Sequence, residues 1–121
     1  MRPSSAKAKG RKLQQVVRDA VLNCFPFLTD KDVKSTTMGE SGIDVQLSEA
    51  ARKLFPWAVE CKNYSKIAVY AWWEQATKAA ESEKLAPLLV IKANLKEPLA
   101  CLRLEDFMKL TRGGSINDST N

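Results

Sequence analysis

Three ionisable side chains on two short segments could carry out hydrolytic chemistry together. Residues 42–47 and 57–62 both alternate apolar and polar side chains, as half-buried β-strands do. This alternation places Glu60 and Lys62 on one face of the second strand, and Asp44 joins them if the two strands are neighbours. Two carboxylates are hard oxygen ligands for a divalent cation, and a nearby lysine can stabilise charge developing on a phosphate. The three residues therefore favour metal-assisted phosphodiester hydrolysis.

Composition excludes several other classes of protein. The chain has no histidine, so any general base must be a carboxylate, a lysine or a metal-bound water. Its three cysteines are widely spaced, which argues against a disulfide framework or a zinc knuckle and favours a reducing, cytosolic setting. No apolar run approaches the roughly 20 residues of a membrane span, and the N-terminus lacks the apolar segment of a signal peptide. We therefore expect an intracellular protein that does not associate with a membrane.

Positive charge is concentrated at the N-terminus. The chain carries a net charge of +5, and the first acidic residue is Asp19. A basic segment of this kind favours contact with nucleic-acid phosphates. The candidate DNA contacts are Arg2, Lys7, Lys9, Arg11 and Lys12. Residues 1–9 are small, polar and basic, so we expect a disordered arm there, and a merely solubilising tail remains an alternative.

The remaining pattern predicts an α/β protein with one domain. Expected elements are a helix over about 10–24, strands over 33–35 and 43–47, a short helix over 49–55 capped by Ser48, a strand over 57–62, a helix over 67–82, strands over 87–91 and 99–104, and a closing helix over 105–110. The order α-β-β-β-α-β-β predicts a mixed central sheet of about five strands flanked by helices. We expect the domain to occupy residues 10–112 and a flexible tail to occupy 113–121.

The spacing of the ionisable residues leads to a known family. Gly42-Ile43-Asp44, followed after fifteen residues by Glu60-Cys61-Lys62, resembles the signature of the PD-(D/E)XK nucleases. The small size and a Gly-Arg near the start of the first helix look most like Holliday-junction resolvases and phage-type endonucleases of that superfamily. Ile43 stands where many members have proline.

This resemblance implies a restriction-endonuclease-like α/β/α core and a role for each residue of the motif. Asp44, Glu60 and the backbone carbonyl of Cys61 would hold Mg²⁺ or Mn²⁺. Lys62 would orient the attacking water and neutralise the phosphate, and Gln75 on the following helix would support the site. The products would carry a 5′-phosphate.

Three further residues, Gln14, Glu40 and Ser41, could contact the metal ligands or a metal-bound water. The first helix of the resembling families often carries an acidic residue that reaches the metal, but this chain has glutamine at the corresponding place. Gln14 could orient a metal-bound water, and an ordinary solvated position is the alternative. Glu40 and Ser41 come shortly before Asp44 in the sequence.

We expect a metal-dependent DNA endonuclease that acts on branched DNA in recombination, as a homodimer because a junction needs two coordinated cuts. One alternative is a non-catalytic nucleic-acid-binding module on the same fold. Another is a non-specific or nicking structure-selective nuclease. A third is a structural protein in which Glu60 and Lys62 form a surface ion pair, because such pairs are common.

Overall fold

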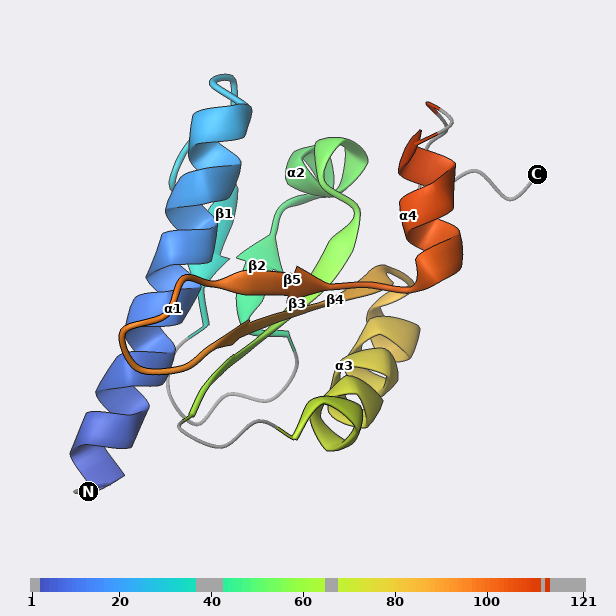
Figure 1. The fold of residues 1–121 in the computed structure, drawn as a ribbon. Coiled ribbons are helices and arrows are strands. Elements are labelled where there is room, and N and C mark those ends of the chain that lie inside the picture. The colour runs from blue at the N-terminus through green and yellow to red at the C-terminus, as the bar shows by residue number, and fades with distance from the viewer. Residues whose placement is uncertain (1–2, 37–42, 65–67, 112, 114–121) are drawn as a thin grey trace.

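Over the residues that the structure describes, four helices and five strands follow one another in the predicted order (Figure 1). The computed structural model describes residues 3–36, 43–64, 68–111 and 113. Its elements are α1 (Pro3–Cys24), β1 (Val33–Ser35), β2 (Val45–Leu47), α2 (Glu49–Leu54), β3 (Trp57–Asn63), α3 (Val69–Glu83), β4 (Ala86–Lys92), β5 (Leu99–Cys101) and α4 (Leu104–Thr111). The predicted α/β class is confirmed.

The five strands form two sheets and not one continuous sheet. β1 and β2 make an antiparallel pair, while β3, β4 and β5 make a mixed sheet in which β3 and β4 are parallel and β4 and β5 antiparallel. The two sheets meet where the Asp44 N–H donates to the Val59 carbonyl at 3.0 Å. β2 has only three residues and leads directly into α2, so the ladder toward β3 does not extend further.

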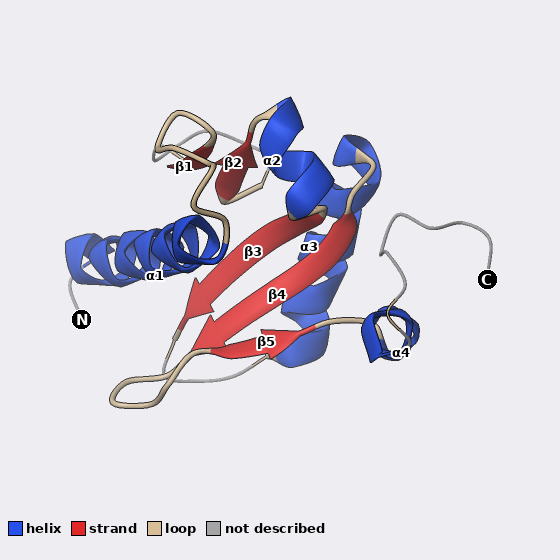
Figure 2. Cartoon of the chain, turned by 90° about the horizontal axis from the view of Figure 1, so that it is seen from above, coloured by secondary structure: helices blue, strands red, loops and turns tan. Residues whose placement is uncertain are grey.

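Helices cover both faces of the three-stranded sheet. α1 and α3 lie on either side of β3 and β4 (Figure 2). Val59 and Cys61 pack in a core cluster with Leu13 of α1, whereas Ala58 packs with Ala80 of α3. The alternation predicted for residues 57–62 is therefore confirmed, and it places Glu60 and Lys62 on the α3 side of the sheet.

α1 begins at Pro3, earlier than the predicted start near Gly10. Proline suits a first helical position, because the missing N–H has no intrahelical partner there. The helix passes through Lys9, whose carbonyl accepts a hydrogen bond from Asn63 Nδ2 at 3.4 Å. The ammonium of Lys9 also donates to Asn94 Oδ1 at 2.9 Å. The predicted helix start near Gly10 is therefore too late, and Lys9 contacts the body of the domain.

The cap predicted for α2 is confirmed, whereas the strand predicted before α4 is too long. Ser48 caps α2, since its hydroxyl accepts from the Ala51 N–H at 3.1 Å. β5 ends at Cys101 and α4 begins at Leu104, so the predicted strand to residue 104 is too long. None of the described helices is long and apolar enough to cross a membrane.

Candidate active site

Asp44 lies at the seam between the two sheets, and its polar groups are fixed by their neighbours. Its N–H donates to Val59, and its carbonyl accepts from the Thr36 N–H at 2.8 Å. One oxygen of its carboxylate accepts from the Cys61 N–H at 2.8 Å. The preceding Ile43 is buried against Ala58 and the C-terminal half of α3. A carboxylate immediately before a short strand is thus held at the edge of β3.

Glu60 and Lys62 stand two residues apart on β3 and point to the same side. The Lys62 ammonium lies 3.5 Å from Glu60 Oε2, and the two side chains are only 16% and 13% exposed. This geometry contradicts the reading of a surface ion pair. The motif brings a lysine and a carboxylate together in a largely buried place beside Asp44.

Burial raises the pKa of both carboxyl groups of the cluster. Burial raises the pKa of Asp44, although the Cys61 N–H and the charge of Lys62 act in the opposite direction. Burial and the charge of Asp44 raise the pKa of Glu60 to about 7. Two carboxylates therefore share a single lysine in a poorly solvated place, and another positive charge there would stabilise both ionised forms.

The motif and its geometry agree with a comparison against protein families. A family model described as "phage putative PDDEXK endonuclease" matches residues 6–117. The chain belongs to this family of phage PDDEXK endonucleases. No curated protein and no solved structure matches the chain. The resemblance seen in the sequence is therefore confirmed over nearly the whole length of the chain.

The other predicted site residues of this PDDEXK chain are spread over three regions. Gln75 is exposed on α3, one turn before Ala79, which packs against the cluster of Ile43 and Ala58. Gln75 thus lies on the same side of α3 as Ala79. Gln14 accepts a hydrogen bond from the Ser35 hydroxyl at 2.7 Å, which attaches it to β1. Arg2, Glu40 and Ser41 lie outside the described residues.

The predicted DNA contacts that the structure describes lie on the half of α1 that reaches the end of β3. Lys7, Arg11 and Lys12 are exposed, and Lys9 is half-buried by its contacts with Asn63 and Asn94. Because Asn63 follows Lys62 directly, this basic half of α1 lies beside the end of β3 that carries the motif.

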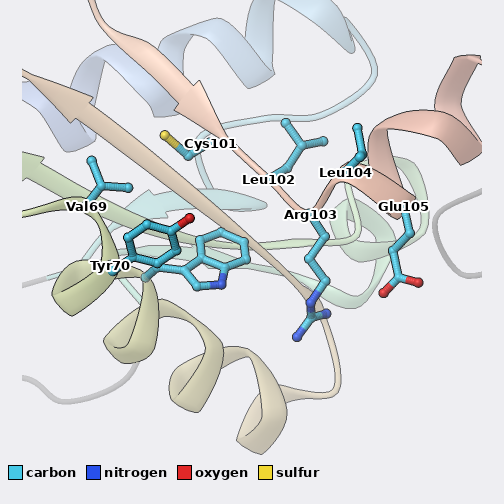
Figure 3. Close-up of a pocket in the computed structure, with 8 residues that line it drawn as sticks. Val69, Tyr70, Cys101, Leu102, Arg103, Leu104 and Glu105 are labelled. Carbon is cyan, nitrogen blue, oxygen red and sulfur yellow. The ribbon is translucent and has the colours of Figure 1, made fainter.

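A separate pocket of about 520 Å³ lies between α3 and the β5–α4 segment (Figure 3). Tyr70 and Trp73 line it from α3, and Cys101 and Arg103 line it from the other side. β4 stands between β5 and β3 in the sheet, so one strand separates β5, which lines this pocket, from the strand that carries Glu60 and Lys62. The pocket contains none of the motif residues.

Thr36 is a residue of the site that the sequence analysis missed. It follows β1, is buried, and its hydroxyl donates to the Ile43 carbonyl while its N–H donates to Asp44. Thr36 therefore holds the backbone of both residues that present the first carboxylate. A threonine after a three-residue edge strand gives no signal of this in the sequence.

Thr36→Val is expected to lower the free energy of unfolding by about 1–3 kcal/mol, because the buried Ile43 carbonyl loses its donor while side-chain volume is kept. Thr77→Val is the matched control, since its hydroxyl donates to the Glu74 carbonyl within the same helix, α3. The control should change stability by less than about 0.5 kcal/mol. Urea unfolding of both variants measures this, and equal effects would contradict the assigned role of Thr36.

The raised pKa of Glu60 predicts how stability depends on pH when no metal is added. Glu60 takes up its proton near pH 7 when folded but near its ordinary 4.5 when unfolded, so the folded state binds more protons between these values. The free energy of unfolding should then fall as pH rises through this range, by at most about 3 kcal/mol. Glu60→Gln should flatten the profile. Parallel wild-type and variant profiles from urea unfolding at pH 5 to 8 would contradict the prediction.

Proposed function

We propose that this PDDEXK chain is a metal-dependent endonuclease that hydrolyses phosphodiester bonds of DNA at the Asp44–Glu60–Lys62 cluster. The observation that carries the proposal is the burial of two carboxylates, one just before β2 and one on β3, beside one lysine. Such a cluster is costly for a purely structural protein, because each ionised carboxylate raises the energy of the other. It suits a protein that binds a cation there.

The donor set fits Mg²⁺ or Mn²⁺. Over residues 3–36, 43–64, 68–111 and 113, no three His, Cys, Asp or Glu side chains group closely enough to hold a metal. Mg²⁺ needs no such group, because one or two carboxylates commonly hold it together with waters and substrate phosphates. The Cys61 carbonyl can join the pair: its N–H points toward Asp44, and both backbone groups of a strand residue point to the same side. Asp44, Glu60 and this carbonyl would hold the ion.

Individual residues of the chain would then have separate roles in hydrolysis. A bound divalent ion supplies Lewis acidity and lowers the pKa of a coordinated water. Lys62 holds a positive charge within 3.5 Å of Glu60, where it can stabilise the charge that develops on the phosphate and orient the attacking water. Thr36 and the Cys61 N–H keep Asp44 in place, so little rearrangement is needed at the moment of reaction. Gln75 on α3 and Gln14 beside β1 are proposed to support these groups.

The basic half of α1 provides a path for the DNA backbone. Lys7, Lys9, Arg11 and Lys12 lie within less than two turns of α1. None of the described residues before Asp19 is acidic. Phosphate contacts of this kind fix the position of DNA without reading its sequence. This supports the proposed DNA contacts and a substrate chosen by shape.

We propose branched DNA as the substrate and a homodimer as the active form. The described residues form one α/β unit, and phosphate contacts along α1 would favour a substrate chosen by its shape. Resolving a four-way junction requires two symmetric cuts, which a two-fold dimer places naturally.

Cleavage assays with and without Mg²⁺ test the proposal. Labelled four-way junction, flap, linear duplex and supercoiled plasmid should be compared, with EDTA and with Mn²⁺. We expect cleavage only with a divalent ion and fastest on the junction. Tight binding of all substrates without cleavage under any metal would replace the proposal with a non-catalytic binding module. Equal rates on plasmid and duplex would indicate a non-specific nuclease.

A further inference from the structure

The loop between β4 and β5 presents a leucine in an unusual backbone conformation. Residues 93–96 form a turn closed by the Lys96 N–H, which donates to the Ala93 carbonyl at 3.2 Å. Leu95 is the third residue of this turn and has φ of 61°. Turns with positive φ at the third position normally have glycine or asparagine there, because the left-handed conformation is unfavourable for a residue with a Cβ.

Packing does not compensate for this conformation. The Leu95 side chain is fully exposed, with a relative exposure of 101%. Strained backbone conformations of this kind cluster at active sites, ligand clamps and switch regions. Leu95 is therefore a candidate contact for another molecule.

Neighbouring elements hold the tip of the loop in place. Asn94, beside Leu95, accepts a hydrogen bond from the Lys9 ammonium of α1 at 2.9 Å. At the base of the loop, the Lys92 carbonyl accepts from the Tyr64 N–H of the segment after β3 at 3.1 Å. The loop extends past the end of the sheet (Figure 2), so Leu95 is carried on an anchored support.

The loop leaves the sheet beside the proposed active site. Lys62 pairs with Ile91 in the register of β3 and β4, and Asn63 pairs with Lys92, the last residue before the loop. A molecule bound at Lys62 therefore lies near the base of the loop.

The surroundings of Leu95 are basic. Lys92 and Lys96 flank it in the sequence, Lys9 contacts the loop, and Glu97 is the only acidic residue between 92 and 98. An apolar side chain surrounded by lysines is complementary to DNA. The lysines would contact phosphates, and the leucine would contact bases. Proteins that bend or open DNA commonly insert such an apolar side chain between base steps.

We infer that Leu95 is a wedge that inserts between bases of the DNA bound at the Asp44–Glu60–Lys62 cluster. The inference rests on the proposed function and deepens it, because it names a determinant of substrate shape. Unstacking a base step costs least where stacking is already interrupted. A wedge therefore favours branch points and mismatches over continuous duplex.

Fluorescence of 2-aminopurine tests the wedge without cleavage. The base analogue is placed at the branch point of a four-way junction and in a matched duplex, and Asp44→Asn protein is added. Binding should raise the fluorescence at the branch point, because unstacking relieves quenching. Adding Leu95→Asn or Leu95→Gly should abolish the rise, and both replacements tolerate positive φ, so the turn is kept. Junction affinity should fall roughly tenfold, the scale of one well-placed apolar contact.

Phe27→Asn is the matched control, because Phe27 is 91% exposed but follows the opposite end of α1. It should leave fluorescence and affinity unchanged. If both Leu95 variants give the same rise in fluorescence as the protein with Leu95, the wedge is overturned. The nuclease proposal still stands in that case, provided that the wild type cleaves the junction. A Leu95-dependent signal in a protein that cleaves nothing would support the wedge and contradict the nuclease. Leu95-dependent binding to anionic lipid vesicles, with no effect on DNA, would overturn the wedge as well.

Discussion

Asp44→Asn and Glu60→Gln are each expected to abolish DNA cleavage while the fold and DNA binding are kept. Each replacement keeps the shape of the side chain and removes the negative charge that a hard cation requires. The loss should be at least about 10²–10³-fold in rate, the scale of losing one preorganised electrostatic contact. Asparagine can still accept the Cys61 N–H through its amide oxygen, so the seam at Asp44 stays closed. Glu60→Gln should not lower stability at neutral pH, because a poorly solvated carboxylate is removed.

Single-turnover cleavage of a labelled junction measures the effect, together with a binding titration and a melting curve for each variant. Asp30→Asn is the matched control, because Asp30 is an exposed acidic residue in the turn before β1 and should cut at the wild-type rate. Cleavage by either purified site variant at the wild-type rate would refute the proposed metal ligands.

Lys62→Ala is the second large effect, and it separates a catalytic lysine from a structural one. If Lys62 faces the reacting phosphate, the variant should still bind DNA and a divalent ion but cleave about 10²–10³-fold more slowly. Lys62→Arg should restore cleavage only in part, because the planar guanidinium is wider than a compact ammonium. Stability should also fall near neutral pH, since Glu60 and Asp44 lose their buried cation.

The control is Glu83→Gln, which breaks the Arg52–Glu83 ion pair of 2.7 Å, whose side chains are 36% and 33% exposed. A pair this exposed contributes about 0–1 kcal/mol, and its loss should leave cleavage unchanged. Single-turnover rates at saturating Mg²⁺, with melting temperature as the folding check, distinguish the two roles. A folded Lys62→Ala protein that cuts at the wild-type rate would remove Lys62 from the mechanism.

The parts of the site that depend on strand alternation could be predicted from the sequence. The polar and apolar positions of 57–62 fixed which face each side chain takes, so Glu60 and Lys62 were placed correctly on one side of β3. Ser48 was recognisable as a cap because its hydroxyl has a local partner. These features depend on neighbours within a few residues of the chain.

Features that depend on distant contacts could not be predicted. Thr36 acts on Ile43 and Asp44 through backbone groups, which leave no trace in the pattern of side chains. The strands divide into two sheets because β2 ends after three residues and α2 follows it. The alternation of polar and apolar residues along a strand does not reveal where that strand ends. Positive φ at Leu95 was hidden too, since Asn94-Leu95-Lys96 contains no glycine. The helical start at Pro3 was missed because polar, basic composition resembles disorder.

The seam at Asp44, where the two sheets meet, limits the fraction of molecules that can cleave DNA at any moment. Asp44 leads into the small β1–β2 sheet and Glu60 belongs to the larger sheet, so a fluctuation that parts the sheets also parts the carboxylates. The Asp44 and Cys61 amides both bond across the seam, so their hydrogen-exchange rates report how often it opens. The fraction of molecules with a closed seam sets an upper limit on the fraction competent to cut. Ligands that bridge the seam would slow exchange at these two amides before they change any other part of the fold.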